Sequence, residues 1–238
     1  MVEEKSNSGV YLTVLGLGTG NLQDAKMEIM ADNGNGNYFY IDTENEAKKV
    51  FGSEIRGTLF TIAKDVKIQV EFNSKLVKSY RLIGYENRKM KNEDFDNDKK
   101  DAGEIGVGHT VTAIYEIEKT NNINMKDLEN QTKDSNFLVN ELLAVKLRYK
   151  KPDGENSNLI SQKVLDEQVS FENAPQNLQF SAAVASFAMV LRKSEYKGES
   201  DYEKIVNWAK AAKGEDKEGY RQEFIELVKM AKDIDSSN

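Results

Sequence analysis

The sequence changes its pattern at about Gly57, and this change constrains the fold more than any other feature of the chain. Before it, apolar runs at 10–16 and 38–41 predict two short strands. Each run is followed by a segment with helical spacing, over 22–32 and 43–53. The continuous apolar character of 10–16 is typical of a strand buried on both faces of a parallel sheet. We therefore expect a partial α/β unit before Gly57.

Beyond Gly57 the chain becomes rich in strand signals. Val66, Ile68 and Val70 alternate with polar residues such as Lys67, which predicts a strand with one buried apolar face. Similar patterns predict further strands, giving segments over 58–72, 77–85, 108–118, 137–149 and 159–171. Antiparallel strands of this kind are typical of a β-sandwich or a curled sheet.

The last third of the chain is helical again. Amphipathic patterns predict helices over 180–192, 200–212 and 219–234, and either Ser200 or Asp201 can cap the second of them. The sequence thus predicts an α+β fold. It consists of a partial α/β unit with two strands and two helices, an antiparallel β-sandwich-like domain and a helical C-terminal segment. The expected domain boundaries are 1–56, 57–175 and 176–238.

Composition excludes several classes of function. The chain has 33 basic and 40 acidic residues and a net charge of −7, which disfavours nucleic acid as a partner because such binding needs clustered Lys and Arg. Cysteine is absent, so disulfides, thiol catalysis and cysteine-based zinc sites are excluded. No stretch approaches the roughly 18 consecutive apolar residues of a membrane span. We expect no membrane contact by this chain itself.

A glycine turn follows the first predicted strand. Gly16, Gly18 and Gly20 precede a helix, and Asp42 ends the next strand, which is similar to a dinucleotide-binding fingerprint. The spacing is GxGxG rather than GxGxxG, and the chain beyond it is rich in strands, so no second mononucleotide-binding half follows. An ordinary strand-to-helix turn explains the same residues. We therefore predict no cofactor in this chain.

An acidic loop offers a candidate metal site. Asp94, Asp96 and Asp98 alternate as at the start of a calcium loop, but Lys99 and Ile105 stand where such a loop needs Gly and Glu. The alternative is a solvated acidic loop with no metal. His109 is the sole histidine of the chain, and no nucleophile or second metal ligand can be matched to it. We predict a structural role for His109 and no catalytic residues.

Several longer motifs resemble one bacterial family. They lie over 11–21, 34–42, 62–73, 80–88 and 101–116. Together they resemble the bacterial von Willebrand factor type A proteins of the YfbK type, including the C-terminal region specific to that family. The resemblance extends from about Gly9 to the last helix.

This resemblance implies what the N-terminal part of the chain is. A type A domain is a doubly wound α/β unit whose metal-ion-dependent adhesion site begins with an Asp-x-Ser-x-Ser motif. The sequence has no such motif, and residues 9–55 resemble only the last two strands and helices of the domain. The ligands of the divalent metal, such as magnesium, would then lie upstream of Met1. The resemblance further implies an extracytoplasmic parent protein of the bacterial cell envelope.

These observations favour a non-enzymatic protein-binding or scaffolding module of the cell envelope, part of a larger type A domain protein. Its protein partner is not identified by the sequence. The alternative is a truncated nucleotide- or metal-dependent enzyme whose catalytic part is missing. The two strands of the type A remnant would leave an open sheet edge, so we also predict that the chain self-associates.

Overall fold

The computed structural model describes residues 10–18, 20, 22–85, 89–100, 102–120, 137–138 and 140–237. The chain forms two compact units, between which it passes repeatedly. The first unit comprises Met1–Asn73, Lys89–Val111 and Met125–Leu165. The second comprises Ser74–Arg88, Thr112–Asn124 and Asp166–Asn238.

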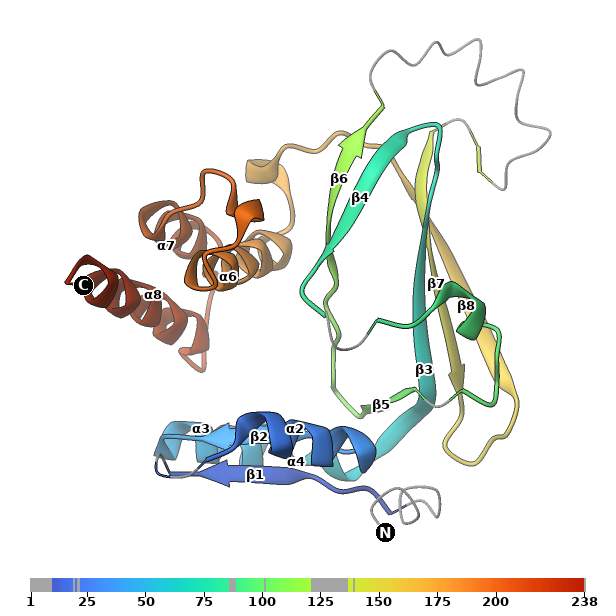
Figure 1. Ribbon diagram of the computed structural model, residues 1–238, viewed down its shortest axis with the longest axis horizontal. Coiled ribbons are helices and arrows are strands. Elements are labelled where there is room, and N and C mark those ends of the chain that lie inside the picture. The colour runs from blue at the N-terminus through green and yellow to red at the C-terminus, as the bar shows by residue number, and fades with distance from the viewer. Residues whose placement is uncertain are drawn as a thin grey trace. The chain divides into compact units, whose positions relative to one another are not determined.

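The first unit begins with a small α/β layer. Strand β1 (Val14–Leu17) pairs in parallel with β2 (Tyr38–Ile41), and the register joins Val14 to Tyr38 and Leu17 to Ile41. Parallel neighbours need a crossover connection, and helix α2 (Asp24–Asn33) provides it (Figure 1). The predicted order of strand, helix and strand is therefore confirmed.

A second helical stretch follows β2. Helix α3 (Glu44–Lys48) is capped by Thr43, whose Oγ1 accepts a hydrogen bond of 3.2 Å from the Glu46 amide. The chain continues through a π-helical turn, η1 (Lys49–Ser53), into helix α4 (Ile55–Leu59). The helical stretch therefore extends beyond the predicted limit of 53 and brings the chain directly to the long strand that follows.

A four-stranded antiparallel sheet completes the first unit. Its strands lie in the order β5-β3-β7-β8, and their bounds are Gly103–Gly106, Thr61–Phe72, Glu141–Lys150 and Ser157–Leu165. A short 3-10 turn, η3 (Asn92–Asp94), lies in the acidic loop that leads to β5. The strand β5 was not predicted, because two glycines in four residues give it no strand-like pattern.

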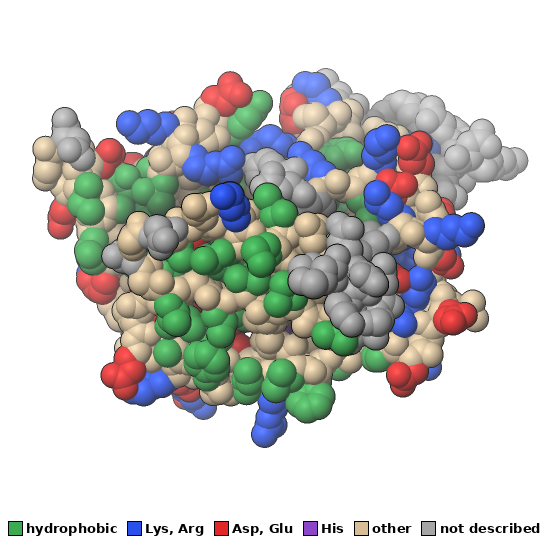
Figure 2. All heavy atoms as spheres, turned by 60° about the horizontal axis from the view of Figure 1, so that its bottom comes forward, with side chains coloured by type: hydrophobic (Ala, Val, Ile, Leu, Met, Phe, Trp, Pro, Cys, Tyr) green, Lys and Arg blue, Asp and Glu red, His purple; other side chains and the backbone are tan. Residues whose placement is uncertain are grey.

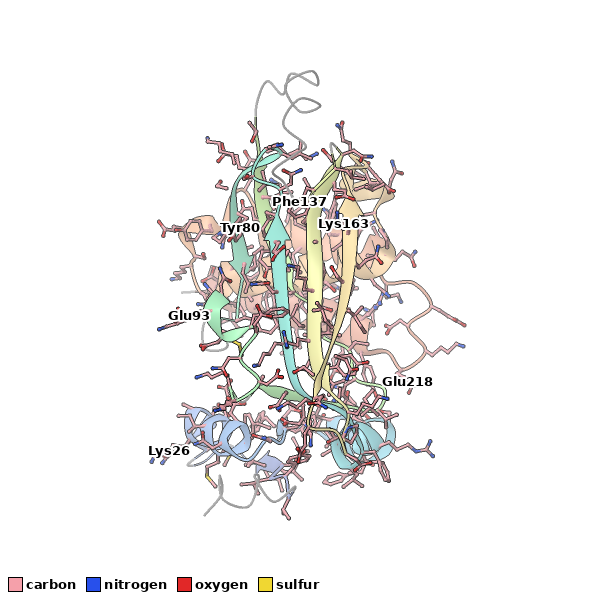
Figure 3. The ribbon with its side chains drawn as sticks, turned by 90° about the vertical axis from the view of Figure 1, so that its right-hand side faces the viewer. Lys26, Tyr80, Glu93, Phe137, Lys163 and Glu218 are labelled. Carbon is pink, nitrogen blue, oxygen red and sulfur yellow. The ribbon has the colours of Figure 1, made fainter. Side chains whose placement is uncertain are left out.

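The predicted burial of strand β3 is wrong in its middle. Lys67 is only 4% exposed, whereas its apolar neighbour Ile68 is 46% exposed. The acidic loop covers the face of the sheet that carries Lys67, as its hydrogen bonds to this side chain demonstrate. Figure 3 shows the loop beside the sheet, marked by Glu93. Alternation located the strand but could not reveal which face a distant loop covers.

The second unit combines a two-stranded antiparallel sheet with helices. Strands β4 (Val77–Ile83) and β6 (Ile114–Lys119) pair with each other. The helices are α6 (Gln176–Leu191), α7 (Tyr202–Ala211) and α8 (Tyr220–Ser236). Short 3-10 turns, η4 (Phe171–Asn173) and η5 (Glu195–Lys197), lie before and after α6. All three predicted C-terminal helices are therefore present.

The three helices enclose the main hydrophobic core of the second unit. Its fully buried members come from all three helices: Ala183, Ile205, Ala209, Ile225 and Val228. Phe224 of α8 packs edge-to-face on Phe180 and Phe187 of α6, with ring centroids 5.4 and 5.6 Å apart. The apolar stripes seen in the sequence are thus the surfaces that hold these helices together.

The fold class is confirmed as α+β, with antiparallel sheets and C-terminal helices. The antiparallel strands belong to two sheets in different units, and their arrangement as a sandwich stays a prediction. The segments 1–56, 57–175 and 176–238 also stay a prediction. The compact units divide the chain differently, because strands β4 and β6 associate with the C-terminal helices in the second unit.

The cap of α7 gives a local test of this fold. The sequence left Ser200 and Asp201 as alternatives, and in the structure Asp201 Oδ1 accepts a hydrogen bond of 2.8 Å from the Lys204 amide. We expect Asp201→Ala to lower the free energy of unfolding by about 1 kcal/mol, since one amide of the first turn loses its partner. Urea titration measures this loss. Ser200→Ala is the control, and an equal loss there would contradict the assignment.

Candidate interaction surface

Large hydrophobic side chains are exposed over the N-terminal part of the first unit. They lie just before and in β1, in η1, at the end of α4 and at the start of β3: Val10, Leu15, Leu17, Phe51, Leu59, Phe60 and Ile62. We call this set the N-terminal apolar surface. Figure 2 turns this part of the chain toward the viewer and shows hydrophobic side chains gathered across it. Extended exposed apolar patches mark interaction sites more often than single exposed residues do.

The surface arises because α2 covers only one face of the two-stranded sheet. Gly16 faces Leu22 and Met27, with so little space that a Cβ atom on Gly16 would lie 3.1 Å from Leu22 Cδ1. Leu15 and Leu17 alternate with Gly16 and therefore point to the opposite face. Leu17 is 69% exposed. The prediction that this strand is buried on both faces is wrong, since an apolar run cannot reveal whether a second layer is present.

The edges of this sheet are open as well. Among the strands that the structure describes, β1 and β2 each pair only with the other. Each strand therefore has one edge whose amide and carbonyl groups have no strand beside them. Such edges are templates for a further strand. The N-terminal segment thus combines an exposed apolar face with two open edges.

The glycine turn is occupied by side chains of the chain itself. The Tyr40 hydroxyl donates to the Gly18 carbonyl at 3.2 Å, and the Tyr38 hydroxyl donates to the Asp24 carboxylate. This bond to Asp24 is the main cause that raises the pKa of Tyr38 to about 12. Asp24 starts α2, where a dinucleotide site would hold a phosphate, and its negative charge would repel that group. The tyrosine hydroxyls thus lie at the glycine turn and at the start of α2, and Asp42 follows the last residue of β2.

All three acidic candidates contact basic side chains of the sheet, two through their carboxylates and Asp94 through its main-chain oxygen. Asp96 and Asp98 both pair with Arg148, at 2.6 and 3.3 Å. A hydrogen bond from Ser157, aided by Arg148, holds the pKa of the Asp98 carboxyl below its ordinary value. Asp94 accepts from Lys67 through its main-chain oxygen at 3.2 Å. Within the described part of the chain, no three potential metal-ligating side chains gather.

The His109 ring packs against Gly57, where the backbone segments at Gly57 and Gly106 lie close together. A Cβ atom on Gly57 would overlap its imidazole ring, and one on Gly106 would overlap the Gly57 carbonyl. The His109 amide donates to the Gly106 carbonyl at 3.1 Å, and Val107 bonds to Phe60 at 2.9 Å. These contacts join α4 to β5. They place the histidine ring against Gly57, and the structural role that the sequence favours stays a prediction.

Comparison with known proteins identifies the family. The family model described as "Uncharacterized protein YfbK, C-terminal" matches residues 57–234. The chain belongs to the YfbK family. The resemblance to YfbK-type proteins is therefore confirmed, and the matched region begins at the glycine where the sequence changes its pattern. It includes the four-stranded sheet of the first unit and all the described elements of the second.

The YfbK protein of Escherichia coli (strain K12), described as uncharacterized, is 43% identical to this chain over 236 residues. The match covers 97% of this chain and 40% of that protein, so the chain spans well under half the length of its curated relative. Among solved structures, the ArnB paralog VWA2 from Sulfolobus acidocaldarius is similar with a TM-score of 0.39 and 14% identity. That match covers 92% of this chain and 50% of the other.

Three features of the site were missed by sequence reasoning. Exposure of Leu17 and Phe60 and burial of Lys67 all depend on what covers a residue in three dimensions. The acids at 94–98 gave no signal for Lys67, because its partners are main-chain oxygens, whereas the carboxylates of Asp96 and Asp98 pair with Arg148. In the part of the chain that the structure describes, no helix is both long and apolar enough to cross a membrane.

Proposed function

We propose that this YfbK-family chain is a non-enzymatic protein-binding or scaffolding module of the bacterial cell envelope. The observation that carries the proposal is the N-terminal apolar surface, because it lies beside two open strand edges. Burying an exposed leucine or phenylalanine side chain stabilises a complex by about 1.5–3 kcal/mol. The adjacent edges would add main-chain hydrogen bonds in register.

The occupant that fits this surface is a polypeptide with α/β character. It would add a strand alongside β1 and cover Leu15 and Leu17 with apolar side chains. The E. coli relative supports this choice, because the chain matches only 40% of its length. The matching family model is described as C-terminal, which supports the proposal that most of the remaining length of the relative precedes the matched part. Such a preceding region would meet the N-terminal end of this chain, where the apolar surface lies.

Three described features support a role in binding rather than catalysis. The sole histidine of the chain packs on Gly57, and the carboxylates of Asp96 and Asp98 pair with Arg148. The Asp24 carboxylate accepts from Tyr38 at the helix start that a phosphate would need. We infer that no cofactor acts in this chain. The envelope location is proposed from the family resemblance alone, and fractionation of the native cells tests it.

The binding proposal is tested by co-expressing the chain with the preceding region of E. coli YfbK. We expect a one-to-one complex in light scattering, with hydrogen exchange slowed over 10–18 and 58–62. Replacing both Leu17 and Phe60 with Ser should weaken the complex by about 100-fold or more, since each loses at least about 1.4 kcal/mol of apolar burial. Both side chains are more than half exposed, so the free chain should keep its stability.

The control is Met230→Ser, which changes a side chain of similar exposure on α8 in the second unit. It should leave the complex unchanged. Absence of any complex would contradict the proposal. A dimer of this chain that the Leu17 and Phe60 replacements abolish would instead identify a second copy as the occupant, which is the outcome that the sequence-based prediction of self-association expects.

A further inference from the structure

Lys67 places a buried positive charge inside the acidic loop. Its side chain is 4% exposed, and its ammonium donates to the main-chain oxygens of Asp94, at 3.2 Å, and Asn97. Removing an ammonium from water is costly unless hydrogen bonds replace its hydration. The loop provides these bonds through main-chain carbonyl groups that point toward the Lys67 ammonium on β3. Lys67 and the loop therefore depend on each other.

The chemistry of this contact is that of a hard cation site. Calcium is held by carboxylates and main-chain carbonyls that converge on one point. Here the carbonyls of Asp94 and Asn97 converge, but the cation at their centre is a side chain of the sheet. The backbone of the loop that suggested calcium in the sequence thus binds a charge that the protein already supplies.

The neighbouring contacts complete the arrangement. Arg148 neutralises the carboxylates of Asp96 and Asp98, and Lys150 donates to the Asp98 carbonyl at 2.9 Å. Phe95 is buried between these polar anchors. The carboxylates therefore point to fixed cations on β7 rather than to a shared centre. The loop is attached to the sheet along most of its length.

We propose that Lys67 is a tethered cation that takes the place of a bound metal ion in the acidic loop. It keeps residues 92–100 folded on the sheet without any metal. The conformation of this loop is then independent of the calcium concentration. This inference is separate from the proposed binding function, because it concerns another face of the first unit.

Two replacements of Lys67 separate its charge from the space that it fills. Lys67→Met keeps the length and removes the charge, whereas Lys67→Ala also leaves room for an ion. Hydrogen exchange over 92–100 is measured with and without millimolar calcium. The wild-type loop should be protected, with no response to calcium. Lys67→Met should speed exchange by about tenfold or more in both conditions, because local opening becomes easier. Lys67→Ala should lose protection without calcium and regain it with calcium.

The matched control is Lys146→Met. Lys146 lies on the same face of the sheet and pairs with Glu71 at 2.5 Å, so its loss should not alter exchange in the loop. Protection that persists in Lys67→Met would overturn the proposal. A wild-type loop that gains protection from calcium would do the same, and this measurement needs no variant to fold. A Lys67→Ala loop that stays open with calcium would refute the role as a metal substitute.

Discussion

Replacing Gly106 with Ala should lower the free energy of unfolding by about 3 kcal/mol or more. A Cβ atom there would lie 2.5 Å from the Gly57 carbonyl carbon and would overlap the carbonyl oxygen. Both clashing atoms belong to backbone, so α4 and β5 must separate for the side chain to fit. Such overpacking usually costs about 1–3 kcal/mol, and rigid backbone raises it. For a chain of this size, we expect the melting temperature to fall by about 6–12 °C.

Gly103→Ala is the control in the same strand. A Cβ atom at Gly103 would meet no atom within 4 Å. Replacing glycine without strain stabilises a protein by about 0.4–1 kcal/mol, so this variant should melt at or slightly above the wild-type temperature. Similar melting temperatures for the two variants would show that α4 and β5 do not approach as described.

Ile205→Ala should destabilise the second unit by about 3 kcal/mol. Ile205 is fully buried in α7, among residues of α6 and α8. Removing its branched side chain loses apolar burial and leaves a cavity that neighbours fill only partly. Urea unfolding followed by the fluorescence of Trp208, which packs on the same core, measures the loss.

The control is Leu227→Ala, since Leu227 is half exposed on α8 and its replacement should change stability by less than about 0.5 kcal/mol. Equal losses would contradict the assignment of the core.

Local signals in the sequence predicted local structure well. The strand at 38–41 and the three C-terminal helices depend on residues a few positions apart. Strand β6 was predicted too early, from 108. The chain in fact turns at Gly108, where φ is 81°, and β6 begins only at Ile114. The alternation of apolar residues at 111 and 113 led to a predicted strand that starts too early, because the pairing with β4 begins only at Ile114, opposite Ile83.

Contacts between distant residues could not be predicted in this way. Lys67 is buried by the acidic loop, whose carbonyl groups 27 and 30 positions away accept its hydrogen bonds. The residues next to Lys67 in the sequence give no sign of this contact. The open face at Leu17 is equally invisible, because a run of apolar residues looks the same with or without a covering layer. The family resemblance, in contrast, drew on motifs spread along the chain and identified the family correctly.

The division into interleaved units has a consequence for how the chain can be dissected. It crosses between the units after residues 73, 88, 111, 124 and 165, so neither unit is a continuous stretch of sequence. A single proteolytic nick between β3 and β7 would leave the two pieces joined through these paired strands, which place Glu71 opposite Ala144. Deleting either terminus would remove part of a shared structure rather than release an autonomous domain. Because such distant segments must meet before the sheet can form, folding should be slow for a protein of this length.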